Sequence, residues 1–137
     1  MEKINVAVVG YGGMGRYHAN HIEEFEKFNL VGIYDIKQSA CDVATEKGVY
    51  VYPSFEAVLE DERVELIVCA TYNDCHKDIA IRAMKAGKAV ISEKPVTMCS
   101  EDLEEMIKAS EETGKLFTVH QNRRWDNDYR MVKRVLD

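Results

Sequence analysis

Residues 10–15 read Gly10-Tyr11-Gly12-Gly13-Met14-Gly15, directly after an apolar run at residues 4–9 and at the start of a segment with helical patterning. This stretch fits the pattern G-x-G-x-x-G. In that pattern the first glycine makes a tight turn, the second lets the backbone approach a pyrophosphate, and the third lets helix and strand pack closely. The N–H groups at the helix start then face the phosphates, where the helix dipole favours negative charge. The stretch predicts a dinucleotide-binding loop, and we expect all six residues to contact the cofactor.

Short apolar runs alternate with helix-length amphipathic segments along the rest of the chain. Strands that are apolar on both faces are typical of a parallel sheet covered by helices on both sides. Ser54 marks an expected helix start and Gly114 an expected helix end. We therefore predict an α/β fold, a doubly wound, mainly parallel Rossmann-type sheet with helices on both faces, as one domain over residues 1–137. The expected strands are residues 4–9, 30–34, 49–52, 66–70, 89–92 and 116–120.

Composition narrows the class of protein further. The 137 residues are 46% hydrophobic and 31% charged, which suits one globular domain with a single core. The net charge of −6 argues against a nucleic-acid partner, because such domains gather lysine and arginine against the phosphate backbone. The apolar runs are far shorter than the ~20 residues that span a bilayer, and no signal-peptide pattern opens the chain. We expect a cytoplasmic protein with no membrane partner.

Cysteines and histidines give no sign of a disulfide or a metal site. The four cysteines include no C-x-x-C pair, so we expect reduced thiols. His18 and His21 lie three residues apart on an expected helix, but a metal site needs at least a third ligand and the sequence suggests none nearby. We therefore expect no metal.

Asp35 stands twenty residues beyond Gly15, at the end of the second expected strand. From this position a carboxylate accepts hydrogen bonds from the adenosine ribose and repels a 2′-phosphate. Such bonds contribute roughly 1.5 to 3 kcal/mol, so NAD is expected to be preferred over NADP by about an order of magnitude or more. Lys37 could partly accommodate the phosphate, which keeps NADP open, and we expect Ile36 between them to contact the cofactor too. The alternative is that Asp35 is only a strand-end turn residue.

Further polar side chains follow the later strands. In a parallel sheet these positions share the carboxyl edge, where open α/β sheets bind ligands, so separate loops converge on one cleft. For any single loop a helix cap or a solvated turn is the competing explanation, and an aromatic residue such as Trp125 could instead belong to the core. The expected cofactor contacts are Thr71, Tyr72, Asn73 and His76, then Glu93 and Lys94, and finally Asn122, Arg124 and Trp125.

The sequence resembles the glucose-fructose oxidoreductase, inositol dehydrogenase and MocA group, usually written Gfo/Idh/MocA. The resemblance spans nearly the whole chain, and it departs from the common pattern at Tyr72, where many relatives have proline. The stretch N-R-R-W-D at residues 122–126 looks like members that oxidise inositols and related sugars. The matching stretches are residues 10–15 with His18-Ala19, residues 71–76, Ala83-Met84-Lys85-Ala86-Gly87-Lys88 and, most particular to the group, Glu93-Lys94-Pro95.

This resemblance implies a function and a catalytic residue. It implies that Lys94 lies beside the nicotinamide and a substrate hydroxyl, with Glu93 near the nicotinamide ribose and a Lys94–Pro95 bond that is cis in several relatives. It also implies a second domain, absent from these 137 residues, that supplies an Asp and His pair near the substrate and much of a homo-oligomer interface. We expect the full-length protein to transfer hydride between nicotinamide and a hydroxyl-bearing carbon of a sugar or cyclitol. The chain alone is expected to be inactive.

Two other readings of the sequence stay open. A non-catalytic, dinucleotide-sensing regulatory protein would keep Asp35 and the glycines but would not need Lys94. A reductase acting on an imine or a pyrrole would differ only in its substrate.

Overall fold

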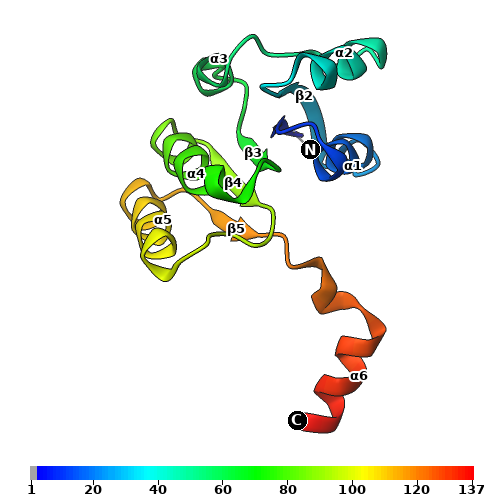
Figure 1. Ribbon diagram of the computed structural model, residues 1–137, viewed down its shortest axis with the longest axis vertical. Coiled ribbons are helices and arrows are strands. Elements are labelled where there is room, and N and C mark those ends of the chain that lie inside the picture. Colours follow the sequence, from blue (N-terminus) through cyan, green and yellow to red (C-terminus); the bar gives the residue numbers. More distant parts are fainter. Residues whose placement is uncertain (1–2) are drawn as a thin grey trace.

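Five short strands form one sheet in the computed structural model, which describes residues 3–137 (Figure 1). The strand order is β2-β1-β3-β4-β5, and every neighbouring pair is parallel. This confirms the predicted Rossmann-type sheet. Successive strands are added on opposite sides of β1, and open α/β sheets bind ligands beyond the carboxyl ends of their strands at such a switch point. The strands are β1 (Ile4–Val9), β2 (Phe28–Tyr34), β3 (Leu66–Cys69), β4 (Ala89–Ser92) and β5 (Phe117–Val119).

Helices cover both faces of the sheet because the central strands are apolar on both sides. Along β1, Ala7 and Val9 pack into one core cluster, while Val6 and Val8 pack into the other. Side chains alternate between the two faces of a strand, so one continuous apolar run supplies both clusters. One face is covered by α1 (Gly13–Ile22) and α2 (Gln38–Glu46), and the other by α3 (Phe55–Glu60), α4 (His76–Lys85) and α5 (Ser100–Thr113).

Residues 49–52 do not form the strand that the sequence predicts. They pair with β2 only through one isolated bridge, between Ile33 and Val51. Two backbone hydrogen bonds support it, one from the Ile33 N–H to the Tyr50 carbonyl and one from the Tyr52 N–H to the Ile33 carbonyl, both 2.8 Å long. The next residue is Pro53, which has no N–H to continue the ladder, so pairing stops there.

Ser54 caps α3, as the sequence predicts. Its Oγ accepts a hydrogen bond from the Ala57 backbone N–H at 3.0 Å. At the C-terminal end of α5, Gly114 is the capping residue and has the left-handed conformation, with φ of 66°. The helix ends on this side of the sheet are therefore fixed by local sequence.

Removing the cap at Ser54 should have a measurable effect on stability. We expect Ser54→Ala to lower the free energy of unfolding by about 1 kcal/mol, because the Ala57 N–H loses its partner. Urea denaturation followed by circular dichroism measures this. Ser39→Ala, at an exposed serine near the start of α2, is the matched control and should change stability by a few tenths of a kcal/mol at most. Equal stabilities for the two variants would contradict the assignment.

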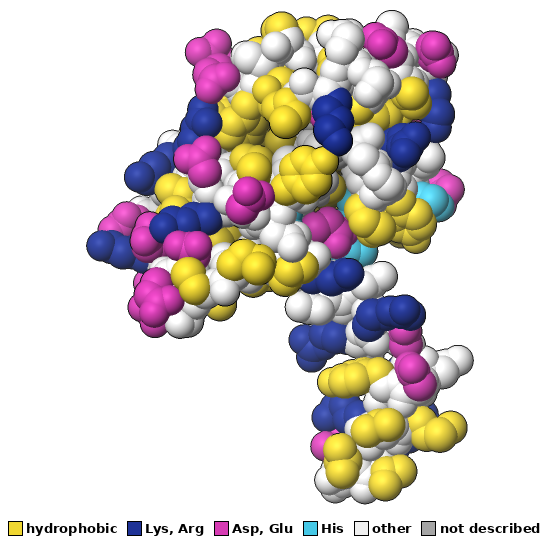
Figure 2. All heavy atoms as spheres, in the orientation of Figure 1, with side chains coloured by type: hydrophobic (Ala, Val, Ile, Leu, Met, Phe, Trp, Pro, Cys, Tyr) yellow, Lys and Arg dark blue, Asp and Glu magenta, His cyan; other side chains and the backbone are white. Residues whose placement is uncertain are grey.

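The C-terminal helix α6 (Asn127–Leu136) projects away from the sheet and its covering helices (Figure 1). No residue of α6 is buried, and hydrophobic side chains gather on it (Figure 2). Met131, Val135 and Leu136 are 69%, 80% and 80% exposed, so the apolar side of this helix is not covered. Neither α6 nor any other helix within residues 3–137 has the length and apolar character needed to cross a membrane.

Candidate cofactor-binding site

The glycine loop joins β1 to α1, which begins at Gly13 with Gly12 as its N-cap. Gly10 has a φ of +91°, and a β-carbon there would lie 2.5 Å from the carbonyl oxygen of Ala70. A β-carbon on Gly15 would overlap the Gly10 carbonyl oxygen, whereas one on Gly12 would meet no atom within 4 Å. Backbone is thus packed tightly at Gly10 and Gly15 and open at Gly12. This matches the separate roles that the sequence pattern predicts for the three glycines.

Asp35 lies beside this loop, one residue past the end of β2. Its Oδ2 accepts a hydrogen bond from the Tyr11 backbone N–H at 2.6 Å, and its Oδ1 accepts one from the Lys37 backbone N–H at 2.8 Å. These bonds hold the carboxylate in one orientation. Each oxygen of an ionised carboxyl group has two acceptor sites, so both oxygens keep capacity for a further donor. Asp35 is therefore arranged to accept hydrogen bonds from two hydroxyl groups of a ribose.

Tyr11 has a different place from the one expected. Its ring is 1% exposed and packs in the core cluster under α1 and α2, and its backbone N–H is already used by Asp35. Tyr11 therefore orients Asp35 and does not line the cleft itself. Within residues 3–137, its hydroxyl is the one buried side-chain polar atom without a hydrogen-bond partner.

A cleft of about 620 Å³ opens at the carboxyl edge between β2, β1 and β3. It brings together eight of the predicted cofactor contacts: Gly10, Gly12, Gly13, Asp35, Ile36, Lys37, Thr71 and Tyr72. It is also lined by residues that were not among the predicted contacts, including Val9, Tyr34, Ala40, Phe55, Ala70, Asp74, Cys75, Asp78, Ile79 and Arg82. Phe55 and Ile79 of that second group come from α3 and α4, where periodicity indicated only core packing. No local signal separates a core position from a cleft wall.

Lys37 and Tyr72 connect the β2 and β3 loops across this cleft. The Lys37 ammonium donates a hydrogen bond to the Tyr72 hydroxyl at 2.7 Å. This bond raises the pKa of Lys37. Tyr72 is the position at which the sequence departs from the family pattern, and here its side chain, 61% exposed, forms part of the cleft wall.

His76 lies beneath the loops, fully buried, and not on the cleft surface where the sequence placed it. Its Nδ1 is 3.0 Å from the Pro95 carbonyl oxygen and its Nε2 is 3.2 Å from the Thr71 carbonyl oxygen. The ring thus ties the loop after β3 to the loop after β4. A direct contact with the cofactor is not available from this position, so its effect on the site is through the two loops.

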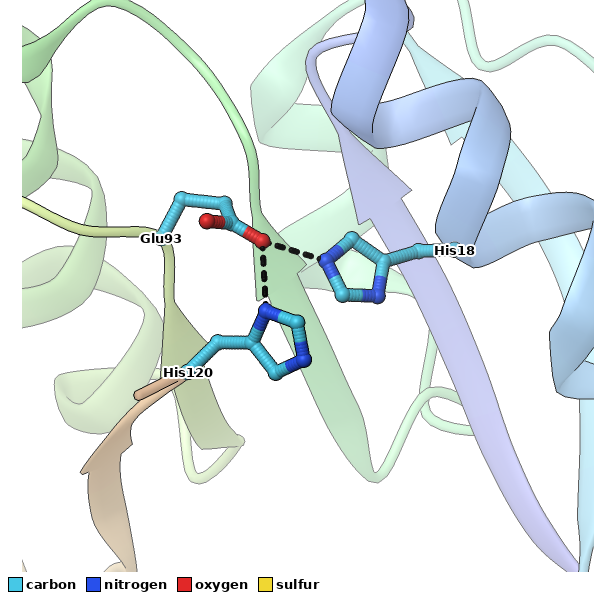
Figure 3. Close-up of side chains that lie close together, drawn as sticks. All are labelled: His18, Glu93 and His120. Atoms are coloured by element: carbon cyan, nitrogen blue, oxygen red, sulfur yellow. Dashed lines mark hydrogen bonds and ion pairs between the residues drawn. The ribbon is translucent and has the colours of Figure 1, made fainter. Parts of the chain in front are cut away.

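Glu93 is the buried carboxylate at the end of β4, and two histidines point at it (Figure 3). His18 Nε2 lies 2.6 Å and His120 Nδ1 lies 2.9 Å from the same oxygen, Oε1. The other oxygen, Oε2, accepts a hydrogen bond from the Lys94 backbone N–H at 3.3 Å. Burial alone would raise the pKa of Glu93, but the hydrogen bonds from His18, from the Lys94 backbone and from His120 outweigh it, and the net shift is downward.

Sequence reasoning missed His18 and His120 as part of this group. The expectation that no third potential ligand lies near His18 is wrong, because Glu93 and His120 place their ligand atoms within 4.8 Å of its ring nitrogen. His120 had one usable signal, since it follows β5 at the same edge as the other polar residues. For His18 the sequence offered only its place in the matching stretch after the glycine loop, and its contact with Glu93 depends on how α1 packs across the sheet.

The remaining predicted residues are exposed at or near the carboxyl edge of the sheet. Lys94 is exposed directly after Glu93, and its peptide bond to Pro95 is cis, as the resemblance implied. Trp125 is 78% exposed, so the alternative that placed it in the core is wrong. Met14 at the start of α1, Asn73 in η1 (Asn73–Cys75), and Asn122 and Arg124 in η2 (Asn122–Trp125) are exposed as well.

A comparison with known protein families shows to which family this chain belongs. Residues 4–121 match the family GFO_IDH_MocA, described as an oxidoreductase family with an NAD-binding Rossmann fold. The chain belongs to the Gfo/Idh/MocA family. It is an NAD(P)-binding domain of this family, and the open backbone at Gly12, the helix start at Gly13 and the oriented Asp35 carboxylate fit such a cofactor.

Several known proteins are similar to the whole chain but extend well beyond it. A crystal structure of an NAD-binding protein from Listeria innocua superimposes with a TM-score of 0.95 at 44% identity, covering 99% of this chain and 39% of that one. The scyllo-inositol 2-dehydrogenase (NADP⁺) of Bacillus subtilis is 29% identical over 99% of this chain and 38% of its own length. The scyllo-inositol 2-dehydrogenase (NAD⁺) of the same organism is 33% identical over 99% and 41%. The chain thus spans about two fifths of the length of these relatives.

Proposed function

We propose that this domain serves a dehydrogenase that moves a hydride between nicotinamide and a hydroxyl-bearing carbon of a cyclitol or sugar. The observation that carries the proposal is Lys94, a charged side chain exposed at the carboxyl end of β4, next to the buried Glu93. A positive group there can orient a substrate hydroxyl and stabilise negative charge that develops on its oxygen. The two relatives named as scyllo-inositol dehydrogenases support the substrate class.

The order of the strands supports a cofactor that extends from the glycine loop toward Lys94. The glycine loop and Asp35 belong to β1 and β2, whereas Glu93 and Lys94 follow β4, which is separated from β1 by β3. Neighbouring strands lie about 4.8 Å apart, so this offset is about 10 Å. A dinucleotide with its adenosine at Asp35 and its pyrophosphate at Gly12 would then extend its nicotinamide toward Lys94. When bound, the nicotinamide accepts or supplies the hydride at C4.

Removing the proton of the substrate hydroxyl needs a positioned base. The chain covers only about two fifths of the length of the two inositol dehydrogenases it resembles. We propose that the rest of the full-length protein supplies this base, as the family resemblance implies. The uncovered apolar side of α6 supports a continuation that packs against it. On this proposal the 137-residue chain binds the cofactor and turns over little or no substrate.

Asp35 provides the test of the cofactor part of the proposal. Calorimetric titration of the chain with NADH and NADPH should show the tighter affinity for NADH. Asp35→Ala should reduce the ratio of the two affinities by about tenfold or more, because the ribose hydroxyls lose a charged acceptor and a 2′-phosphate is no longer repelled. Asp42→Ala, at an exposed aspartate on α2, is the control and should leave the ratio unchanged. An unchanged ratio in Asp35→Ala would refute this role for Asp35.

A further inference from the structure

Three side chains from distant parts of the sequence converge at the carboxyl edge of the sheet. His18 comes from α1, Glu93 from the end of β4, and His120 from the residue after β5 (Figure 3). Their ligand atoms, two imidazole nitrogens and one carboxylate oxygen, all lie within 4.8 Å of one another. The side chains of His18 and Glu93 are 13% and 7% exposed, and that of His120 is 29% exposed. The group is thus largely enclosed but reachable from solvent on the His120 side.

We propose that His18, Glu93 and His120 form a binding site for a divalent transition-metal ion of the zinc class. Two imidazoles and one carboxylate are a ligand set that holds Zn²⁺ and leaves a fourth position for water. Imidazole nitrogens suit zinc, copper, nickel and cobalt, whereas magnesium and calcium prefer oxygen ligands. The donor types therefore favour a transition metal over the hard cations.

The metal-free geometry needs only side-chain adjustment to take the ion. The Glu93 oxygen is now 2.6 Å from His18 Nε2 and 2.9 Å from His120 Nδ1. Ligands about 2.0–2.2 Å from a tetrahedral ion lie about 3.3 Å from one another. The oxygen must therefore move away from each ring nitrogen by roughly half an ångström, and the two ring nitrogens, which lie within 4.8 Å of each other, must come to about the same 3.3 Å separation through rotation of the imidazole side chains. Each neutral ring must also carry its proton on the opposite nitrogen, which exchange with solvent allows.

The proposed function adds a consequence at this site. If the nicotinamide half of the cofactor lies beside Glu93 and Lys94, an ion held by Glu93 takes that carboxylate away from the cofactor and adds positive charge next to the ring. Bound NAD⁺ also carries a positive charge on its nicotinamide ring, so ion and cofactor bind antagonistically. This consequence rests on the proposed function, whereas metal binding itself does not.

Cobalt absorption and calorimetry test the site without nucleotide or substrate. Titration of the chain with Co²⁺ should produce visible absorption bands that saturate at one ion per chain, and Zn²⁺ should abolish them. His18→Ala and His120→Ala should each weaken Zn²⁺ binding by at least about tenfold, since even residues that only support metal ligands contribute that much. His21→Ala is the matched control, because His21 lies on the same helix with a side chain 41% exposed. Circular dichroism of each variant without metal establishes that it is folded.

The outcomes separate this site from others on the same chain. Absent cobalt bands, or equal losses in His18→Ala and His21→Ala, would overturn the proposal. Cys75 and Cys99 are exposed thiols, and a cobalt–thiolate site adds an intense near-ultraviolet band to the visible ones, so the appearance of that band would overturn it too. If Zn²⁺ binds but the affinity for NAD⁺ is the same with and without Zn²⁺, the site is upheld and only its link to the cofactor is contradicted.

Discussion

Lys94→Ala in the full-length protein is expected to lower kcat by about two to three orders of magnitude, with little change in the dissociation constant for NADH. Removing a single group that stabilises charge in the transition state typically has an effect of about this size. In the proposed binding mode the cofactor is held mainly by the glycine loop and Asp35, and within residues 3–137 no hydrogen bond or ion pair joins Lys94 to them. Steady-state turnover with a cyclitol, together with calorimetric titration of NADH, separates the two quantities.

A second lysine makes this experiment specific. Lys85 is the last residue of α4 and is exposed, away from the carboxyl ends of the strands. Lys85→Ala should therefore leave kcat unchanged. Unchanged turnover in Lys94→Ala would remove Lys94 from the mechanism. It would also favour the non-catalytic, dinucleotide-sensing reading of the sequence, because such a protein needs the glycines and Asp35 but not this lysine.

Gly15→Ala is expected to reduce the free energy of unfolding by at least about 3 kcal/mol, the largest stability effect that the structure indicates for one methyl group. The added β-carbon would overlap the Gly10 carbonyl oxygen, which is backbone and lies directly after the interior strand β1. Neither α1 nor β1 can withdraw without breaking the packing between them. Urea denaturation of the variant and the unmodified chain measures the difference.

Gly12→Ala is the matched change in the same loop. It is expected to affect stability little and NADH affinity strongly. Its β-carbon would meet no atom within 4 Å and the φ of −73° is open to alanine, so the free energy of unfolding should fall by no more than about 1 kcal/mol, the usual cost of alanine at an N-cap. NADH affinity should nevertheless fall by about tenfold or more, because the methyl group enters the space that a pyrophosphate needs. Similar stabilities for Gly12→Ala and Gly15→Ala would contradict the division of roles in this loop.

The parts of the fold that sequence predicted correctly are those set by neighbouring residues. Apolar runs that supply both faces of a strand indicated the parallel sheet, and Ser54 and Gly114 marked helix ends through contacts within a few residues. The glycine loop and Asp35 were predictable for the same reason, since their spacing follows from one strand-helix-strand unit. Residues 49–52 show the limit of this reasoning, because their apolar pattern fits a strand but Pro53 ends the pairing after a single bridge.

By itself, the sequence determined the Rossmann-type fold, the glycine loop between β1 and α1 and the place of Asp35 beside it, because hydrophobic periodicity and turn chemistry act over short distances along the chain. Only the tertiary structure decided that His76 lies buried between two carbonyl groups and that Tyr11 turns into the core. It also decided that His18 and His120, 75 and 27 residues from Glu93, share one of its oxygens. Such contacts depend on the order of the strands and on how the helices pack across them. A pattern of neighbouring residues does not predict which residues far apart in the sequence will meet.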